Sequence, residues 1–177
     1  MTRQSVLRRA LLTSHVVVSV GWLGAVLVYL ALGIAALTSD QTDLVRGVYL
    51  AMDWAGRTVL IPLAVLSLVT GVLQSLSTRW GLLRHYWVIV KLGLAVFATV
   101  VLVLYMQTLA LFADTARTEP LDMAVLRSPS VVVHSSGALV VLGLATILSI
   151  YKPAGLTRRG QRLRHLTKQQ RAAHVSR

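Results

Sequence analysis

Four side chains that can do chemistry recur on one face of the first apolar stretch. His15, Ser19, Trp22 and Tyr29 follow one another at intervals of four, three and seven residues, which is the spacing of one face of an α-helix. Because an unsatisfied polar group is costly in hydrocarbon, we expect this face to point into a helix bundle. His15 is then a neutral imidazole bonded to a neighbouring helix, an axial haem ligand or a proton-transfer group.

Two polar residues in later apolar stretches are candidates for the same site. Gln74 lies on a small and polar seam of the second stretch, where it can hydrogen-bond to a bound group. Lys91 follows Trp87 by four residues, at the start of the third stretch. Its ammonium either snorkels back to the membrane surface or faces inward and pairs with an anion such as a haem propionate. Lys91 is also the candidate catalytic residue, a role that rests on the resemblance described below.

Residues near the opposite ends of the predicted spans offer a site for copper instead of haem iron. His134 opens the fourth stretch, and depth counting separates it from His15 by more than ~15 Å, so the two should not bind one iron. The three methionines after the initiator belong to the same end: Met52, Met106 and Met123. Imidazole and thioether suit Cu(I), although methionine is also a common packing residue. Copper at His134 is the alternative to haem at His15.

The elements that must position these residues are four transmembrane helices. The chain is 55% hydrophobic and 14% charged, with a mean hydropathy of +0.69, which is too apolar for a soluble globule. Four runs are long enough to cross about 30 Å of hydrocarbon: residues 11–37, 59–76, 87–112 and 131–151. We predict an all-α four-helix bundle over residues 1–151 and a basic tail over 152–177. The loop Thr38 to Arg57 is expected to form a short amphipathic helix on the outer surface.

The charges predict the orientation of the bundle. Arginine and lysine dominate the N-terminus, the link between the second and third spans, and the tail, whereas all six acids lie in the other two loops. Under the positive-inside rule both termini are cytoplasmic. Because the net charge of +12 gathers on one face, we expect it to contact anionic lipid headgroups at about 1 kcal/mol per cation, and not nucleic acid. The excess of arginine over lysine suggests a bacterial protein, which would be multi-pass in the inner (plasma) membrane.

Several kinds of chemistry are excluded by composition and motif. The sequence has no cysteine, which excludes disulfides, thiolate metal sites, iron–sulfur clusters and covalently attached c-type haem. It contains no phosphate-binding loop, nucleophile elbow or zinc-protease motif. With every acid in an outer loop, a carboxylate-driven pump is disfavoured.

Short motifs resemble one superfamily of four-helix membrane proteins. His15, Trp22 and Gly24 in the first span and Trp87-x-x-x-Lys91-Leu92 in the third resemble the HemJ-type protoporphyrinogen oxidases. Thr70-Gly71, Thr78-x-Trp80-Gly81 and Lys91-Leu92 are similar to the copper-resistance CopD domain. The closest likeness is to uncharacterised bacterial membrane proteins of this CopD and HemJ-like superfamily. The HemJ likeness implies haem b on His15 with Lys91 in the same active region, although the chain has Ile89 where that group usually has histidine.

Three functions therefore remain open. The first is a haem-b-binding redox protein, an oxidoreductase if it is an enzyme, with His15 as ligand and Trp22, Gln74 and Lys91 lining the pocket. The second is a copper-handling or transport protein with His134 as ligand. The third is a cofactor-free structural or assembly subunit, working as a homo-oligomer or within a larger membrane complex.

Overall fold

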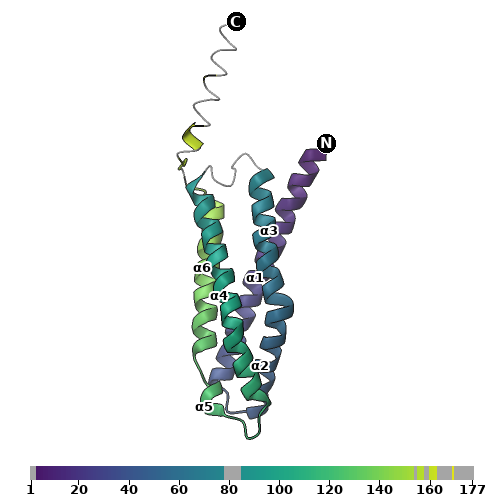
Figure 1. Cartoon of the computed structure of the whole chain (residues 1–177), viewed down its shortest axis with the longest axis vertical. Helices are drawn as coiled ribbons and strands as arrows, with labels where there is room; N and C mark the ends of the chain where they lie inside the picture. Colours follow the sequence, from purple (N-terminus) through teal and green to yellow (C-terminus); the bar gives the residue numbers. More distant parts are fainter. Residues whose placement is uncertain (1–2, 78–84, 154, 158–159, 163–168, 170–177) are drawn as a thin grey trace.

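The chain folds as an all-α bundle of four long helices. The structure, a computed structural model, describes residues 3–77, 85–153, 155–157, 160–162 and 169. The elements in chain order are α1 (Arg3–Thr38), α2 (Thr42–Ala55), the π-helical turn η1 (Gly56–Leu60), α3 (Ile61–Ser77), α4 (Tyr86–Arg117), α5 (Met123–Leu126) and α6 (Ser130–Tyr151) (Figure 1). Among the described residues, four helical segments are long and apolar enough to cross a membrane: Ser5–Thr38, Thr42–Ser77, Tyr86–Arg117 and Met123–Tyr151. The predicted four-helix membrane bundle is confirmed.

The long helices alternate in direction, so the loops gather at two ends. Figure 1 shows the start of α1, the end of α3, the start of α4 and the end of α6 at one end of the bundle. We call it the basic end, because the arginine-rich stretches of the sequence adjoin it. The α1–α2 turn and α5 lie at the other end, here called the acidic end. This arrangement is the one that the positive-inside argument requires, and the side of the membrane that each end faces stays a prediction.

The first loop is helical, as predicted, but it does not lie apart on the outer surface. Helix α2 continues through η1 into α3 as one segment, Thr42–Ser77. Its apolar face is buried inside the bundle, where Val45, Tyr49 and Met52 are 0–1% exposed. The ring of Tyr49 packs against Phe112 of α4 with 5.3 Å between ring centroids. The apolar face of this amphipathic helix therefore packs against protein.

The π-helical turn packs tightly against α4. Pro62 follows it and has no N–H to donate to the preceding turn, and prolines and π-turns both interrupt regular helix geometry. A Cβ built on Gly56 would lie 2.6 Å from Cε of Met106. Glycine at this position therefore lets the backbone of η1 approach α4.

Helices α1 and α6 also meet at a glycine, though at one that the sequence had not singled out. A Cβ on Gly24 of α1 would meet nothing within 4 Å, and one on Gly21 would make an ordinary contact with Leu63. A Cβ on Gly33 would instead lie 2.7 Å from Val131 of α6. Of these three glycines of α1, the one in tight contact is thus the one nearest the acidic end.

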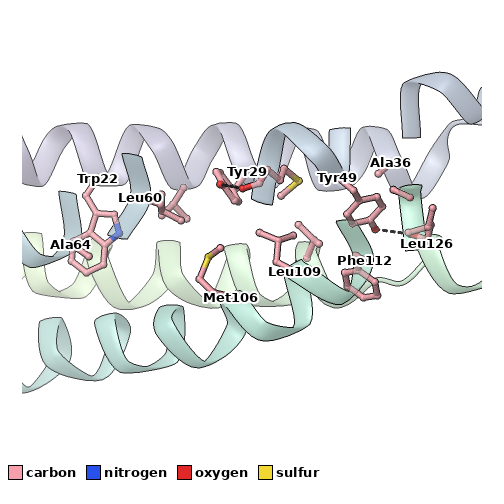
Figure 2. Close-up of a cluster of buried hydrophobic side chains, with 14 of the residues drawn as sticks. Trp22, Tyr29, Ala36, Tyr49, Leu60, Ala64, Met106, Leu109, Phe112 and Leu126 are labelled. Carbon is pink, nitrogen blue, oxygen red and sulfur yellow. Dashed lines mark hydrogen bonds between the residues drawn. The ribbon is translucent and has the colours of Figure 1, made fainter. Parts of the chain in front are cut away.

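The buried core runs along the bundle axis from its middle to the acidic end. Figure 2 shows Trp22 and Ala64 at one end of this cluster and Tyr49, Phe112 and Leu126 at the other. The hydroxyl of Tyr49 donates to the backbone carbonyl of Leu126, which ties α2 to α5. Towards the basic end, residues 6–10 of α1 are exposed instead.

Helix α6 ends where the sequence predicted. Lys152 adopts a left-handed conformation (φ 44°) directly after Tyr151, and Pro153 follows. The backbone N–H of Tyr86 donates to the carbonyl of Gly155 over 3.4 Å, so the segment after α6 contacts the start of α4. Most of the basic tail, and the cations of the link between α3 and α4, lie outside the described residues.

Candidate functional site

Three helices bring polar side chains together in the half of the bundle nearest the basic end. His15 of α1 lies between Thr70 of α3 and Lys91 of α4. Its Nδ1 is 3.1 Å from Oγ1 of Thr70, and its Nε2 is 3.2 Å from Nζ of Lys91. The imidazole is 8% exposed, so it belongs to the small set of buried polar side chains. We call His15, Thr70 and Lys91 the His15 cluster.

The hydrogen bonds of the His15 cluster determine the tautomer of the imidazole. The hydroxyl of Thr70 donates to the carbonyl of Leu66 over 2.6 Å, so its oxygen is left to accept. Nδ1 of a neutral His15 must then carry the proton and donate to Thr70, which leaves the lone pair on Nε2. That lone pair accepts from the amine of Lys91. The cluster therefore holds the imidazole in the tautomer that offers Nε2 to a cation.

Close packing and a second polar pair hold α1 against α3 at this level. A Cβ built on Gly71 would lie 3.0 Å from Cε1 of His15, so the missing side chain makes room for the ring. One turn further along α1, Ser19 and Ser67 bond through their hydroxyls over 2.9 Å. In the sequence, Thr70 and Gly71 stand out only as part of a short motif. Their positions relative to His15 are features of the packing.

Lys91 points inward in the structure. The proposal that its stem snorkels to the membrane surface is wrong, because Nζ lies at Nε2 of a buried histidine. All six acids of the chain fall within residues 40–53 and 114–122, towards the acidic end, so no aspartate or glutamate is at hand to neutralise the amine. An amine held in the apolar interior without a carboxylate is a marked feature, since intramembrane ionisable groups are rare unless they function.

The other two residues predicted for a haem pocket have different surroundings. Gln74 is half-buried on α3, one turn beyond Thr70 towards the basic end, on the same helix face. Trp22 is 3% exposed and lies two turns beyond His15, where it lines a separate cavity. The structure therefore brings His15 and Lys91 into contact, and it places Trp22 in the middle of the bundle.

That cavity, which we call the lateral cavity, has a volume of about 250 Å³. Helices α1, α4 and α6 and the turn η1 supply its walls, and most of its lining is apolar. Its aromatic walls include Trp22, Tyr29, Phe97 and Tyr105. Figure 2 shows Trp22 and Tyr29 on α1 facing Met106 on α4 across the interior. His15, Lys91 and Gln74 are not among its lining residues.

His134 lies at the wall of the lateral cavity. Its ring stacks on Tyr105 with 4.0 Å between centroids and 21° between planes. Nδ1 lies 2.8 Å from the carbonyl of Ser130, and since a carbonyl only accepts, Nδ1 carries the proton there. The hydroxyl of Tyr105 donates to Oγ of the same serine over 3.1 Å. Nε2 of His134 is left as an acceptor.

The possible copper ligands of the acidic half have different surroundings. Met106 lines the same cavity as His134, but Met52 is fully buried beneath the hydroxyl of Tyr29, which donates to its carbonyl. Met123 begins α5. In the described part of the chain there is no group of three or more histidines and carboxylates arranged to hold a metal ion. His134 and Met106 are thus two of the four proposed ligands, at one cavity.

The His15 cluster fits an axial ligand for haem iron in its chemistry. Histidine ligands of metals usually donate their second ring N–H to a neighbouring acceptor, as Nδ1 of His15 does to Thr70. Lys91 holds the position in front of Nε2, so ligation requires its amine to swing aside on its flexible stem.

No family model, no curated protein and no solved structure matches the chain.

Proposed function

We propose that this multi-pass membrane protein is a bacterial inner-membrane oxidoreductase that binds haem b through Nε2 of His15. The observation that supports the proposal is the hydrogen-bonded order Lys91, His15, Thr70, which crosses three helices inside the bundle. It presents an imidazole lone pair in a buried position, next to an amine that lacks a carboxylate. A packing histidine would need neither feature.

Each residue of the cluster has a distinct task in this proposal. Thr70 accepts from Nδ1 and so maintains both the tautomer and the plane of the ring. Gly71 admits the ring against α3. Bound haem would supply one-electron chemistry, which the protein tunes by ligand, hydrogen bonding and burial.

In this proposal Lys91 supplies a positive charge and a hydrogen-bond donor beside the haem ligand His15. Its Nζ gives His15 a hydrogen-bond donor in the absence of a bound group. Once displaced from Nε2, the amine can pair with a carboxylate of the haem or carry a proton to a bound substrate at Nζ. Gln74, one turn towards the basic end, can donate to the same carboxylate. At that end, the arginine-rich stretches would contact anionic headgroups, whether the protein works alone, as a homo-oligomer or in a larger complex.

The test is an absorption spectrum of the protein purified from cells supplied with haem precursor. We expect a Soret band that shifts on reduction with dithionite and disappears in His15→Ala. His134→Ala is the matched control, because it removes the other histidine that lies within a long described helix and should retain the band. A colourless wild type would refute haem binding, and metal analysis of the same sample would then distinguish copper at His134 from a cofactor-free subunit.

A further inference from the structure

The lateral cavity has a lining that suits a ligand taken from the bilayer. Of its lining residues, Phe97 of α4 is 56% exposed and Val133 of α6 is 64% exposed, whereas Trp22 and Leu60 at the far wall are 3–4% exposed. The exposed residues mark the mouth, which therefore opens along the lipid-facing side of α4 and α6. A molecule dissolved in the membrane can enter without crossing water.

The volume and lining of the cavity suit a ligand that consists of a flat ring and an apolar chain. A volume of about 250 Å³ lies just below the ~300–1,000 Å³ of pockets that enclose a whole drug-sized ligand, so the cavity holds a headgroup and leaves a chain in the lipid. Trp22, Tyr29 and Phe97 supply aromatic walls, and aromatic side chains stack or pack edge-to-face with a flat ring.

The hydrogen bonds of His134 and Tyr105, two polar residues of the lining, favour a ligand that has a hydroxyl group. Nε2 of His134 is an acceptor, because Nδ1 has its proton committed to the carbonyl of Ser130. The hydroxyl proton of Tyr105 is also already in a hydrogen bond, because it is donated to Oγ of Ser130. A ligand that donates to Nε2 is thus satisfied, whereas neither His134 nor Tyr105 has a donor left for a ligand with only a carbonyl. From these observations we propose that the lateral cavity binds a membrane-dissolved quinol, its ring among the aromatic walls and one hydroxyl donating to His134.

The site is separate from the His15 cluster, yet one helix connects them. Trp22 follows His15 by seven residues, which places it about 10 Å further along α1, and it forms part of the cavity wall. A quinol here would therefore lie within the same bundle as the proposed haem site. Binding of the quinol does not depend on haem, so the two proposals can fail separately.

Two glycines of α6 provide a matched pair of variants. A Cβ at Gly137, which lines the cavity, would meet nothing within 4 Å, and the same is true at Gly143, which does not line it. Gly137→Leu should therefore fold and obstruct the cavity, while Gly143→Leu adds the same side chain elsewhere on the same helix. Ala98→Leu obstructs the cavity from α4 and serves as a second blocking variant.

The experiment measures binding of decylhydroquinone and of its dimethyl ether to detergent-purified protein by titration calorimetry under nitrogen. We expect saturable binding of the hydroquinone to the wild type, to Gly143→Leu and to His15→Ala, and at least tenfold weaker binding to Gly137→Leu and Ala98→Leu. The ether and the variant His134→Leu should each weaken binding about tenfold, the cost of one unmade hydrogen bond, and His134→Gln should recover part of it.

Three results would overturn the proposal. Equal affinity for the hydroquinone and its ether would show that the cavity accepts any apolar ring. Unchanged affinity in both blocking variants would place the binding elsewhere. Absence of saturable binding to the wild type would mean that lipid chains alone fill the cavity. Loss of the Soret band in His15→Ala with retained quinol binding would leave both proposals standing.

Discussion

Gly71 lies so close to His15 that a Cβ added at position 71 would stand 3.0 Å from Cε1 of the imidazole. The ring therefore occupies space that any other residue at 71 would claim. We expect Gly71→Ala to destabilise the wild type by about 1 kcal/mol through overpacking. In a His15→Ala background the same change should be neutral or stabilising, because the obstructing ring is gone and alanine is the better helix former.

Thermal unfolding of the two single variants and the double variant in detergent, followed by circular dichroism, measures this coupling. Gly143→Ala is the control, since a Cβ there meets nothing within 4 Å. Additive effects would contradict the packing described for the ring.

Thr70 should control the affinity of the proposed haem site without touching the haem. Thr70→Val removes the acceptor of Nδ1 at nearly constant volume, and loss of such an outer hydrogen bond costs 10–100-fold in affinity at comparable metal sites. Thr70→Ser retains the hydroxyl and should retain the affinity. Titration of the haem-free protein with haemin, read at the Soret band, compares the three proteins. Equal affinity in Thr70→Val would show that the tautomer does not depend on Thr70.

The contact between α1 and α6 predicts a sharp difference between two glycines of α1. Gly33→Ala introduces a methyl 2.7 Å from Val131, so we expect a loss of about 1–3 kcal/mol. Gly24→Ala meets nothing within 4 Å and should leave the stability unchanged or raise it. Unfolding curves of both variants decide the matter, and Val131→Ala should restore much of the stability lost in Gly33→Ala.

The buried hydroxyl of Tyr49 stabilises the packing at the acidic end of the bundle. Tyr49→Phe keeps the ring against Phe112 but leaves the carbonyl of Leu126 without this donor. We expect a cost of about 1 kcal/mol, within the range measured for hydrogen bonds in membrane proteins. The unfolding midpoint in detergent should fall accordingly, whereas Phe112→Leu would test the ring contact alone. No change in Tyr49→Phe would indicate that water satisfies the carbonyl.

The orientation in the membrane can be tested directly, because the chain has no cysteine of its own. Thr118 and Gln161 are both exposed and lie beyond opposite ends of the bundle. A membrane-impermeant maleimide applied to spheroplasts should label Thr118→Cys and spare Gln161→Cys until the membrane is opened. The reverse pattern would place the basic end outside and contradict the positive-inside argument.

The sequence by itself predicted the class, the number of spans and the buried face of α1. These follow from properties that each segment carries alone: apolar length, the periodicity of His15, Trp22 and Tyr29, and the helix stop at Lys152 and Pro153. Such local signals need no knowledge of the neighbouring helices.

Tertiary packing determined which side chains of different helices contact one another. Whether Lys91 reached the surface or His15 depended on the rotation of α4 against α1, which spacing within either helix leaves free. The same holds for Thr70 and Gly71, which meet the imidazole from a third helix, and for the face of α2, which was expected at the surface and is buried against α4. Amphipathic spacing shows that a face is apolar, and only the assembled bundle determines whether lipid or protein covers it.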